Sequence, residues 1–147
     1  MRIPMVVLDA VRHAAEAAYP YEACGFLAGE AVANGEVVVR RRVSAENRCL
    51  AEGSARNRYE LSPSDFLVAE RTLGTEGLEI VGIYHSHPDA PARPSTYDRE
   101  LAWPWYRYLI MSVVQGVARE ARAWQLTDDR REFVEDTVTV EERATCL

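Results

Sequence analysis

Hydrophobic positions near the start of the chain recur at helical spacing and then give way to two apolar runs typical of strands. The helical positions are Leu8, Val11, Ala14 or Ala15, and Ala18. Pro20 is expected to end this helix soon after Tyr19. Residues 23–33 (ACGFLAGEAVA) predict a strand, and Asn34-Gly35 predicts a hairpin turn. Residues 36–43 (EVVVRRRV) predict a second strand that ends at its three arginines.

The middle of the chain predicts a loop followed by a capped helix. Residues 44–58 are polar and poorly periodic, which favours a loop, and residues 59–61 read as a short extended piece. Ser62-Pro63 can open a helix, with the serine as N-cap and the proline at the first helical position. This helix is expected to run to about Leu73, where Gly74 can cap it.

The second half of the chain predicts a buried strand that leads into a candidate site. Residues 79–84 (EIVGIY) form a short apolar run that ends on His85-Ser86-His87-Pro88. A loop punctuated by prolines reaches Pro94, a helix begins near Ser95, and Trp103-Pro104 breaks that helix. Three closing strands are predicted at residues 108–117, 119–127 and 131–140. These elements together predict a mixed sheet with helices packed on it.

Length and composition indicate one globular domain. The chain has 147 residues, of which 48% are hydrophobic, and a single domain covering residues 1–147 is expected. Apolar segments all fall short of the roughly 18 residues that a membrane span needs. Asp9, Arg12 and His13 interrupt the N-terminal apolar stretch too early for a signal peptide. We therefore expect a soluble, cytoplasmic protein.

The net charge and the cysteine spacing limit which binding partners and which cellular compartment are expected. The formal net charge is −6 and the pI is about 5.1, and all 17 positive charges are arginine because the sequence contains no lysine. A phosphate backbone would be repelled by such a chain, so a nucleic-acid partner is not expected, and neither is a membrane. Cys24, Cys49 and Cys146 are too widely spaced for a CxxC pair, and we expect reduced, structural thiols.

A pair of histidines at the end of the buried strand is the first candidate for chemistry. Residues i and i+2 of a strand point to the same side, so His85 and His87 project together while Ser86 faces away. Two imidazoles on one face suit a zinc ion, and Pro88 keeps the pair at the rim of the sheet. A histidine pair alone is more often a strand end satisfied by hydrogen bonds.

Asp98 is the best candidate for a third ligand. Ser95 has the residue type of an N-cap, which places Asp98 on the first turn of the helix. The loop after His87 is long enough to fold that turn back over the histidines. A His-His-Asp set with water in the fourth position would be a tetrahedral hydrolytic zinc site. The SxxD pattern by itself is an ordinary capping box.

Residues 85–98 together read HSHPDAPARPSTYD, which is HxHP, six residues and then SxxD. This string resembles the JAMM motif of the MPN+ metalloprotease family, in which an upstream glutamate precedes HxHPx6SxxD. Glu22 in YEACGFLAG resembles the family's E-x-C-G-hydrophobic-hydrophobic-x-G segment. The likeness extends from about Met5 to Val114, and the last strands fit less distinctively.

The resemblance implies an α/β (α+β) fold: a single MPN-type domain with a mixed β-sheet flanked by helices, on a cytidine-deaminase-like plan. It also implies that His85, His87 and Asp98 hold one zinc ion per chain together with a catalytic water. Glu22 would act as general base and then pass the proton to the leaving amine, while Ser95 would help to stabilise the oxyanion. Zinc can lower the pKa of water to roughly 7, and a positioned carboxylate can move its proton.

The resemblance further implies a substrate. The family includes enzymes that cut after the C-terminal Gly-Gly tail of ubiquitin-like proteins, and this chain looks like its small stand-alone prokaryotic members, several of which act on sulfur-carrier proteins. We therefore expect a zinc-dependent metallopeptidase or isopeptidase that cleaves the amide bond after such a tail. The alternatives are a non-catalytic MPN-type scaffold or protein-interaction module, and a nucleobase deaminase. The deaminase alternative is weaker because the sequence has no P-C-x-x-C signature.

Other residues near the motif are assigned structural roles. Cys24 is expected to be a buried thiol. Asp89 and Arg93 are expected to be solvated, with substrate contact as the alternative. The aromatic cluster is expected to pack in the core, with one or two members as candidates to line a groove for a peptide tail. Its members are Trp103, Trp105, Tyr106 and Tyr108.

Overall fold

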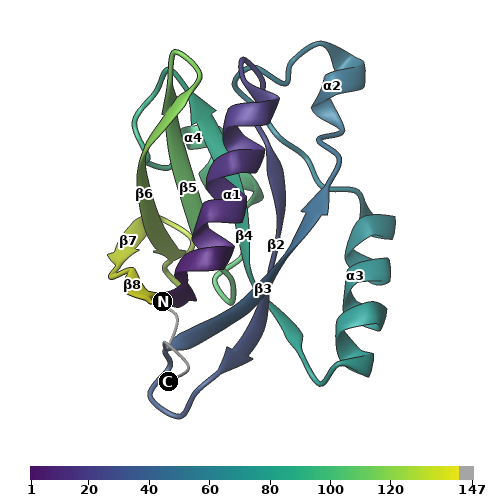
Figure 1. Ribbon diagram of the computed structural model, residues 1–147, viewed down its shortest axis with the longest axis vertical. Coiled ribbons are helices and arrows are strands. Elements are labelled where there is room, and N and C mark those ends of the chain that lie inside the picture. The colour runs from purple at the N-terminus through teal and green to yellow at the C-terminus, as the bar shows by residue number, and fades with distance from the viewer. Residues whose placement is uncertain (143–147) are drawn as a thin grey trace.

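The computed structural model describes residues 1–142, so Cys146 lies outside the described part. The chain folds into an eight-stranded mixed sheet with helices packed on it (Figure 1). The strands are β1 (Arg2–Pro4), β2 (Cys24–Ala31), β3 (Val37–Ala45), β4 (Glu79–Pro88), β5 (Arg107–Val114), β6 (Val117–Leu126), β7 (Phe133–Asp136) and β8 (Thr139–Glu141). The helices are α1 (Met5–Ala18), α2 (Cys49–Glu52), α3 (Pro63–Thr75) and α4 (Thr96–Leu101). The fold class predicted from the sequence, a mixed sheet flanked by helices, is confirmed.

The sheet is strongly curled. Its strand order is β7-β6-β5-β4-β2-β3-β1-β8, with β4 parallel to β5 and β1 parallel to both of its neighbours. The two edge strands, β7 and β8, are separated only by residues 137–138, so the two ends of the sheet must lie close together. The N-terminal ammonium of Met1 donates to Asp136 Oδ2 at 2.9 Å, and Arg107 Nε approaches the same oxygen at 3.2 Å. These contacts tie the start of the chain to β7.

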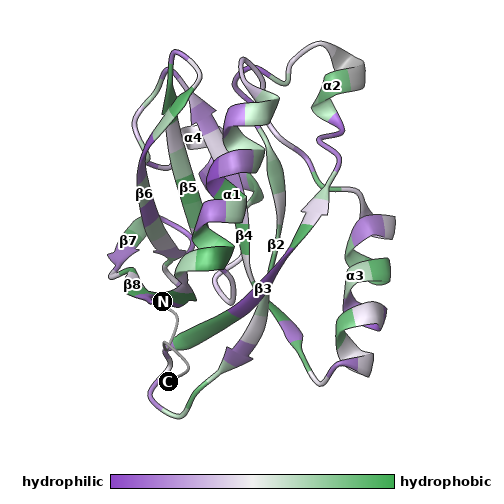
Figure 2. Cartoon of the chain, viewed as in Figure 1, coloured by the Kyte–Doolittle hydropathy of each residue, from purple (hydrophilic) through white to green (hydrophobic). Residues whose placement is uncertain are grey.

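Two hydrophobic cores lie on opposite faces of this sheet. Neighbouring side chains of β2 point to opposite faces of the sheet, so Leu27 belongs to the core beneath α1 and Phe26 to the core beneath α3. The residues that α1 buries are Val7, Leu8, Val11 and Ala15. Figure 2 shows hydrophilic and hydrophobic residues alternating along α1, as expected for a helix with one buried side. The candidate residues at the end of β4 lie on the α3 side, where Tyr59 packs.

The three arginines of β3 do not end that strand, contrary to the prediction. β3 continues to Ala45, which pairs with Cys24 of β2. Arg40 forms an ion pair with Glu30 at 2.6 Å, and Arg41 forms one with Glu76 at 2.9 Å. Long arginine stems can leave a paired strand and reach acidic neighbours, so a run of charge does not interrupt the ladder.

Three other boundaries also differ from the prediction. Residues 44–58, expected to be a loop, contain the end of β3 and the short helix α2. Gly74 lies inside α3, and the left-handed φ of +71° falls on Gly77 instead. The third closing segment, residues 131–140, divides into β7 and β8 at opposite ends of the strand order. None of the helices in residues 1–142 is long and apolar enough to cross a membrane.

Candidate metal centre

The antiparallel pairing of β2 and β4 brings Glu22 beside the two histidines. The start of β2 lies next to the end of β4, with Cys24 opposite His85. Ser86, which points away from the histidines, accepts a hydrogen bond from the Ala23 N–H at 2.8 Å through its hydroxyl. Its own N–H donates to the Ala23 carbonyl at 3.1 Å. The residue between the two histidines therefore holds the segment that carries Glu22.

Three donor atoms from two elements converge in the centre of the site. His85 Nε2 lies 3.1 Å from His87 Nε2, and Asp98 Oδ2 lies 3.3 Å from the first and 3.1 Å from the second. All three side chains are buried. Ligands at about 2.0–2.1 Å from a tetrahedral zinc ion are separated from one another by about 3.3 Å, so the three spacings suit that ion.

The helix α4 delivers Asp98 through a capping box. The Asp98 N–H donates to Ser95 Oγ at 3.0 Å, and the Ser95 N–H donates to Asp98 Oδ2 at 2.8 Å. The predicted cap is therefore present, and it places Asp98 next to the two histidines. The cap uses only an acceptor lone pair of the Ser95 hydroxyl, so its proton remains available to a substrate oxygen.

Hydrogen bonding and burial set the protonation of the three donors. A carbonyl oxygen can only accept, so the 2.9 Å contact between His87 Nδ1 and the Pro91 carbonyl places the proton of His87 on Nδ1. With Nδ1 turned to the Pro91 carbonyl, Nε2 is the ring nitrogen of His87 that faces His85 and Asp98. Burial lowers the pKa of His85, and the opposing attraction of Asp98 only partly offsets this.

Asp98 is the anionic member of the set. Burial alone would raise its pKa, but the attraction of His85 and hydrogen bonds from both histidines and the Ser95 N–H hold it below its usual range. The Nε2 atoms of His85 and His87 and the Asp98 carboxylate therefore face one point, where a cation could be held by all three.

Glu22 stands next to this set without belonging to it. Its side chain is 4% exposed, its Oε1 lies 3.8 Å from His87 Nε2, and its Oε2 has no hydrogen-bond partner among the described residues. Burial, followed by the negative charge of Asp98, raises the pKa of Glu22 to about 9. A cation held by the neighbouring donors would remove this penalty, so the residues present fit a metal ion.

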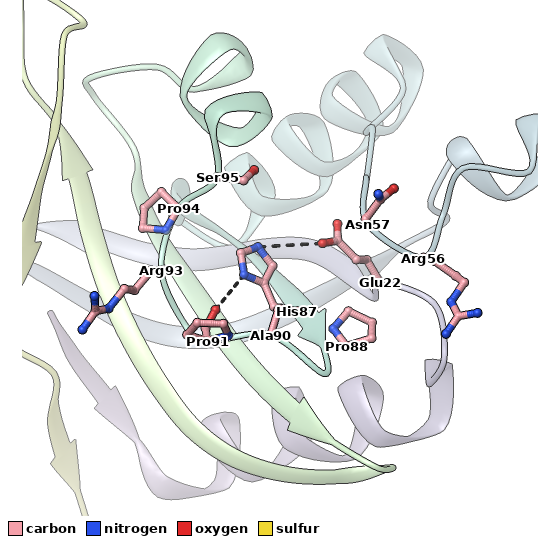
Figure 3. A pocket seen from close by; sticks show the side chains of 10 residues that line it. All are labelled: Glu22, Arg56, Asn57, His87, Pro88, Ala90, Pro91, Arg93, Pro94 and Ser95. Atoms are coloured by element: carbon pink, nitrogen blue, oxygen red, sulfur yellow. Dashed lines mark hydrogen bonds and ion pairs between the residues drawn. The ribbon is translucent and has the colours of Figure 1, made fainter.

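The site opens into a cavity of about 330 Å³ (Figure 3). Glu22 and His87 face it from one side, and Figure 3 places Arg56 and Arg93 at opposite ends of it. Its remaining lining residues are Asn57, Pro88, Ala90, Pro91, Pro94 and Ser95. Water and one peptide segment can therefore reach the carboxylate of Glu22 and the hydroxyl of Ser95 from the same space.

The proline-rich loop between β4 and α4 is fixed by three successive carbonyl groups. Ser112 Oγ donates to the Ala90 carbonyl at 2.7 Å, and Trp124 Nε1 donates to the Ala92 carbonyl at 3.0 Å. The carbonyl between them is that of Pro91, which accepts from His87. Side chains from β4, β5 and β6 thus hold the loop that carries Arg93 and leads to Ser95.

Cys24 and Asp89, two residues near the motif, were predicted to have structural or solvated roles. Burial raises the pKa of Cys24 to about 12, so it is a protonated structural thiol as predicted. Asp89 accepts from Tyr19 Oη at 2.6 Å and from the Gln115 N–H at 2.8 Å, so it anchors the loop.

The aromatic cluster is only partly core. Tyr108 is buried as predicted, and its hydroxyl accepts a hydrogen bond from the Trp103 N–H at 2.8 Å. Trp103 and Trp105 are 45% and 62% exposed and stack on each other with ring centroids 4.9 Å apart. Core packing is thus wrong for the two tryptophans, which follow the end of α4 at Leu101 and are exposed.

Sequence reasoning missed Asn47, which lies in the segment expected to be a loop. Its amide nitrogen donates to the carbonyls of Glu22 and Arg58 at 3.0 and 2.9 Å, and its amide oxygen accepts from the N–H groups of Cys49 and Glu60 at 3.0 and 3.2 Å. One buried asparagine thus satisfies four backbone groups and fixes the backbone of Glu22. Nothing in the local pattern distinguishes it from a solvated loop asparagine.

We expect Asn47→Ala to destabilise the protein by about 3 kcal/mol, because four backbone groups would lose a buried partner. Thermal and urea unfolding followed by circular dichroism measure the change. The exposed Asn57 provides the matched control, and Asn57→Ala is expected to change stability by less than about 0.5 kcal/mol. Equal stabilities for the two variants would contradict the role given to Asn47.

The family model described as prokaryotic homologs of the JAB domain matches residues 4–127. The chain belongs to this family. The match extends beyond Val114 and takes in all of β6, and it ends before β7 and β8.

Individual relatives agree with this membership. The desampylase of Haloferax volcanii is 37% identical over 109 residues, which cover 72% of this chain and 73% of the relative. The desampylase of Pyrococcus furiosus is 31% identical over 118 residues, which cover 75% of this chain and 70% of the relative. A Salinibacter ruber protein of known solution structure is 38% identical with a TM-score of 0.75, over 96% of this chain and 92% of that one. The chain is accordingly a JAMM-type hydrolase.

Proposed function

We propose that this protein hydrolyses the amide or isopeptide bond after the C-terminal Gly-Gly of a ubiquitin-like or sulfur-carrier protein. One zinc ion would be held by His85, His87 and Asp98. The observation that supports this most strongly is the convergence of three buried lone-pair donors beside Glu22, whose Oε2 has no partner within residues 1–142. A buried carboxylate next to a metal-binding set is the arrangement that hydrolysis by water requires.

Each catalytic residue has a role that its position allows. Zinc, when bound, acts as a Lewis acid on the substrate carbonyl and lowers the pKa of water to about 7. Glu22 accepts the proton of the attacking water, keeps it in a buried position away from solvent, and donates it to the nitrogen of the leaving amine. Ser95 donates its free hydroxyl proton to the carbonyl oxygen as negative charge develops there.

The substrate class rests on the relatives and on the shape of the site. Two curated relatives are desampylases, and the motif resembles that of peptidases acting on Gly-Gly tails. A glycine tail suits a cavity walled by the prolines of the loop, because residues without side chains can pass closely along a rigid wall. The leaving amine is either a lysine side chain, a peptide or a free amino acid such as cysteine.

Mass spectrometry of a Gly-Gly-tailed carrier conjugated to an acceptor tests the proposal. We expect zinc-loaded protein to release the carrier with a mass that ends on its terminal glycine, through addition of one water. A carrier that stays intact in the presence of zinc-loaded protein, or a product cut elsewhere, would contradict the proposed bond. Release of ammonia from nucleosides would point to the deaminase alternative.

Removal of the metal is expected to abolish this activity without unfolding the protein. The three ligands lie on β4 and α4, which the sheet ladder and the capping box already hold. Treatment with a chelator, followed by dialysis, should stop cleavage while the circular dichroism spectrum is kept. Restoration by stoichiometric zinc completes the test. Full activity in verified metal-free protein would contradict the metal's role.

A further inference from the structure

A second hollow of about 340 Å³ adjoins the catalytic cavity. The two hollows share Arg93, Pro94 and Ser95. The second one lies between the start of α4 and the β6–β7 end of the sheet. Its other lining residues are Thr96, Arg99, Trp124, Arg131, Glu132 and Phe133. We call the two adjoining hollows together the arginine groove, after the four arginines that line them: Arg56, Arg93, Arg99 and Arg131.

The charges of the arginine groove are opposite to those of the whole protein. The chain carries a net charge of −6, yet four arginines line the groove, against Glu132 and the buried Glu22 as its only acidic lining residues. Local positive potential along a groove concentrates and orients negatively charged ligands. The field of the groove therefore selects for acidic groups, even though the protein as a whole repels polyanions such as nucleic acids.

These arginines have few partners of their own. Within residues 1–142, the side chains of Arg56 and Arg93 make no ion pair and no hydrogen bond, and Arg56 acts on Asp89 only through its charge, which lowers the pKa of that carboxyl. Arg99 donates to the carbonyl of Arg131, and the single ion pair of Arg131 is a 4.0 Å contact to Asp129 with the arginine side chain 85% exposed. Away from the groove, Arg40 forms a short ion pair with a neighbouring carboxylate instead.

We propose that the arginine groove binds an acidic polypeptide segment of the substrate conjugate, next to the bond that is cleaved. The proposal rests on the proposed function and adds the chemistry by which the substrate is chosen. Guanidinium groups donate paired hydrogen bonds to a carboxylate in a bidentate geometry. Trp124 and Phe133 offer apolar surface for the aliphatic part of the side chains of the same segment. Glycines flanked by aspartates or glutamates would lie across Glu22 and Ser95 with their charges over the arginines.

Two versions of one conjugate test this inference. Both contain the same Gly-Gly isopeptide bond, and in the second the aspartates and glutamates that flank the bond are replaced by asparagine and glutamine. We expect KM to be about tenfold higher for the neutral version, with little change in kcat, because exposed charge pairs contribute mainly to docking. Raising the salt concentration should reduce the difference.

Substitution of arginines in the groove shows which residues cause the difference in KM between the two versions of the conjugate. The double variant Arg93→Gln/Arg131→Gln is expected to remove most of the difference in KM between the two versions. Arg71→Gln serves as the matched control, because Arg71 is also exposed but lies on α3 outside the groove, and it should preserve the difference. Equal KM values for both versions with the unmodified protein would overturn the inference, as would a difference that survives the double variant.

A binding measurement separates failure of this inference from failure of the proposed function. If neither version is cleaved, the proposed bond is wrong. Fluorescence anisotropy of the labelled acidic and neutral peptides with metal-free protein then tests separately whether the groove prefers the acidic peptide. Tighter binding of the acidic peptide, lost in the double variant, would uphold the inference. Equal binding of both peptides would overturn it.

Discussion

Glu22→Gln is expected to reduce turnover by about 10²–10⁴-fold while zinc remains bound at one ion per chain. Glu22 lies beside the metal-binding set, with its Oε1 3.8 Å from His87 Nε2, and it is not one of the three converging donors. Its loss therefore removes the proton acceptor for water and the proton donor for the leaving amine, and keeps the ligands. Turnover of the conjugate and zinc content by mass spectrometry measure the two effects separately.

The substitution is expected to be tolerated by the fold. Burial and Asp98 raise the pKa of Glu22 to about 9, so in the metal-free protein this carboxyl is neutral at pH 7 and glutamine has the same shape and charge. Glu46→Gln makes the same chemical change at an exposed position and should leave turnover unchanged. Loss of zinc together with turnover in Glu22→Gln would make Glu22 a ligand, and undiminished turnover would remove it from the mechanism.

Asp98→Asn is expected to lower zinc affinity by at least about 100-fold and to abolish turnover at limiting zinc. Removal of a residue that only orients a ligand typically costs 10–100-fold in metal affinity, so removal of the anionic ligand should cost more. Asparagine keeps an oxygen that can accept from the Ser95 N–H, so the helix start is preserved. Competition with a chromogenic chelator gives the affinity.

Ser95→Ala provides the matched control for the cap. It removes the hydroxyl that accepts from the Asp98 N–H at 3.0 Å, at a cost of about 1 kcal/mol in stability, and it leaves the three donors in place. Zinc affinity should therefore change little, while turnover falls because the carbonyl oxygen loses a donor. An unchanged zinc affinity in Asp98→Asn would mean that the third ligand lies elsewhere.

The centre of the site could be predicted from sequence because its geometry is local. Period-two alternation places His85 and His87 on one side of β4, and the SxxD pattern places Asp98 on the first turn of α4. Glu22 is distant in sequence and entered through the family motif. The pairing of Cys24 with His85 explains its proximity, because the register of two antiparallel strands joins their ends.

The surroundings of the site could not be predicted because they depend on contacts between distant segments. Asn47 looks like a loop residue until the fold brings four backbone groups around it. Arg40 and its neighbours stay within β3 because acidic partners come from β2 and the end of α3. Trp103 was expected in the core on residue type alone, and its exposure follows from where α4 ends.

Anomalous diffraction at the zinc edge, from crystals of the zinc-loaded protein, gives the most direct evidence on the metal centre. We predict one peak per chain, enclosed by His85 Nε2, His87 Nε2 and Asp98 Oδ2, with the carboxylate of Glu22 next to it and not among its ligands. A peak bound by Glu22 or by a cysteine sulfur, or the absence of any peak among the three donors, would contradict the metal centre described here.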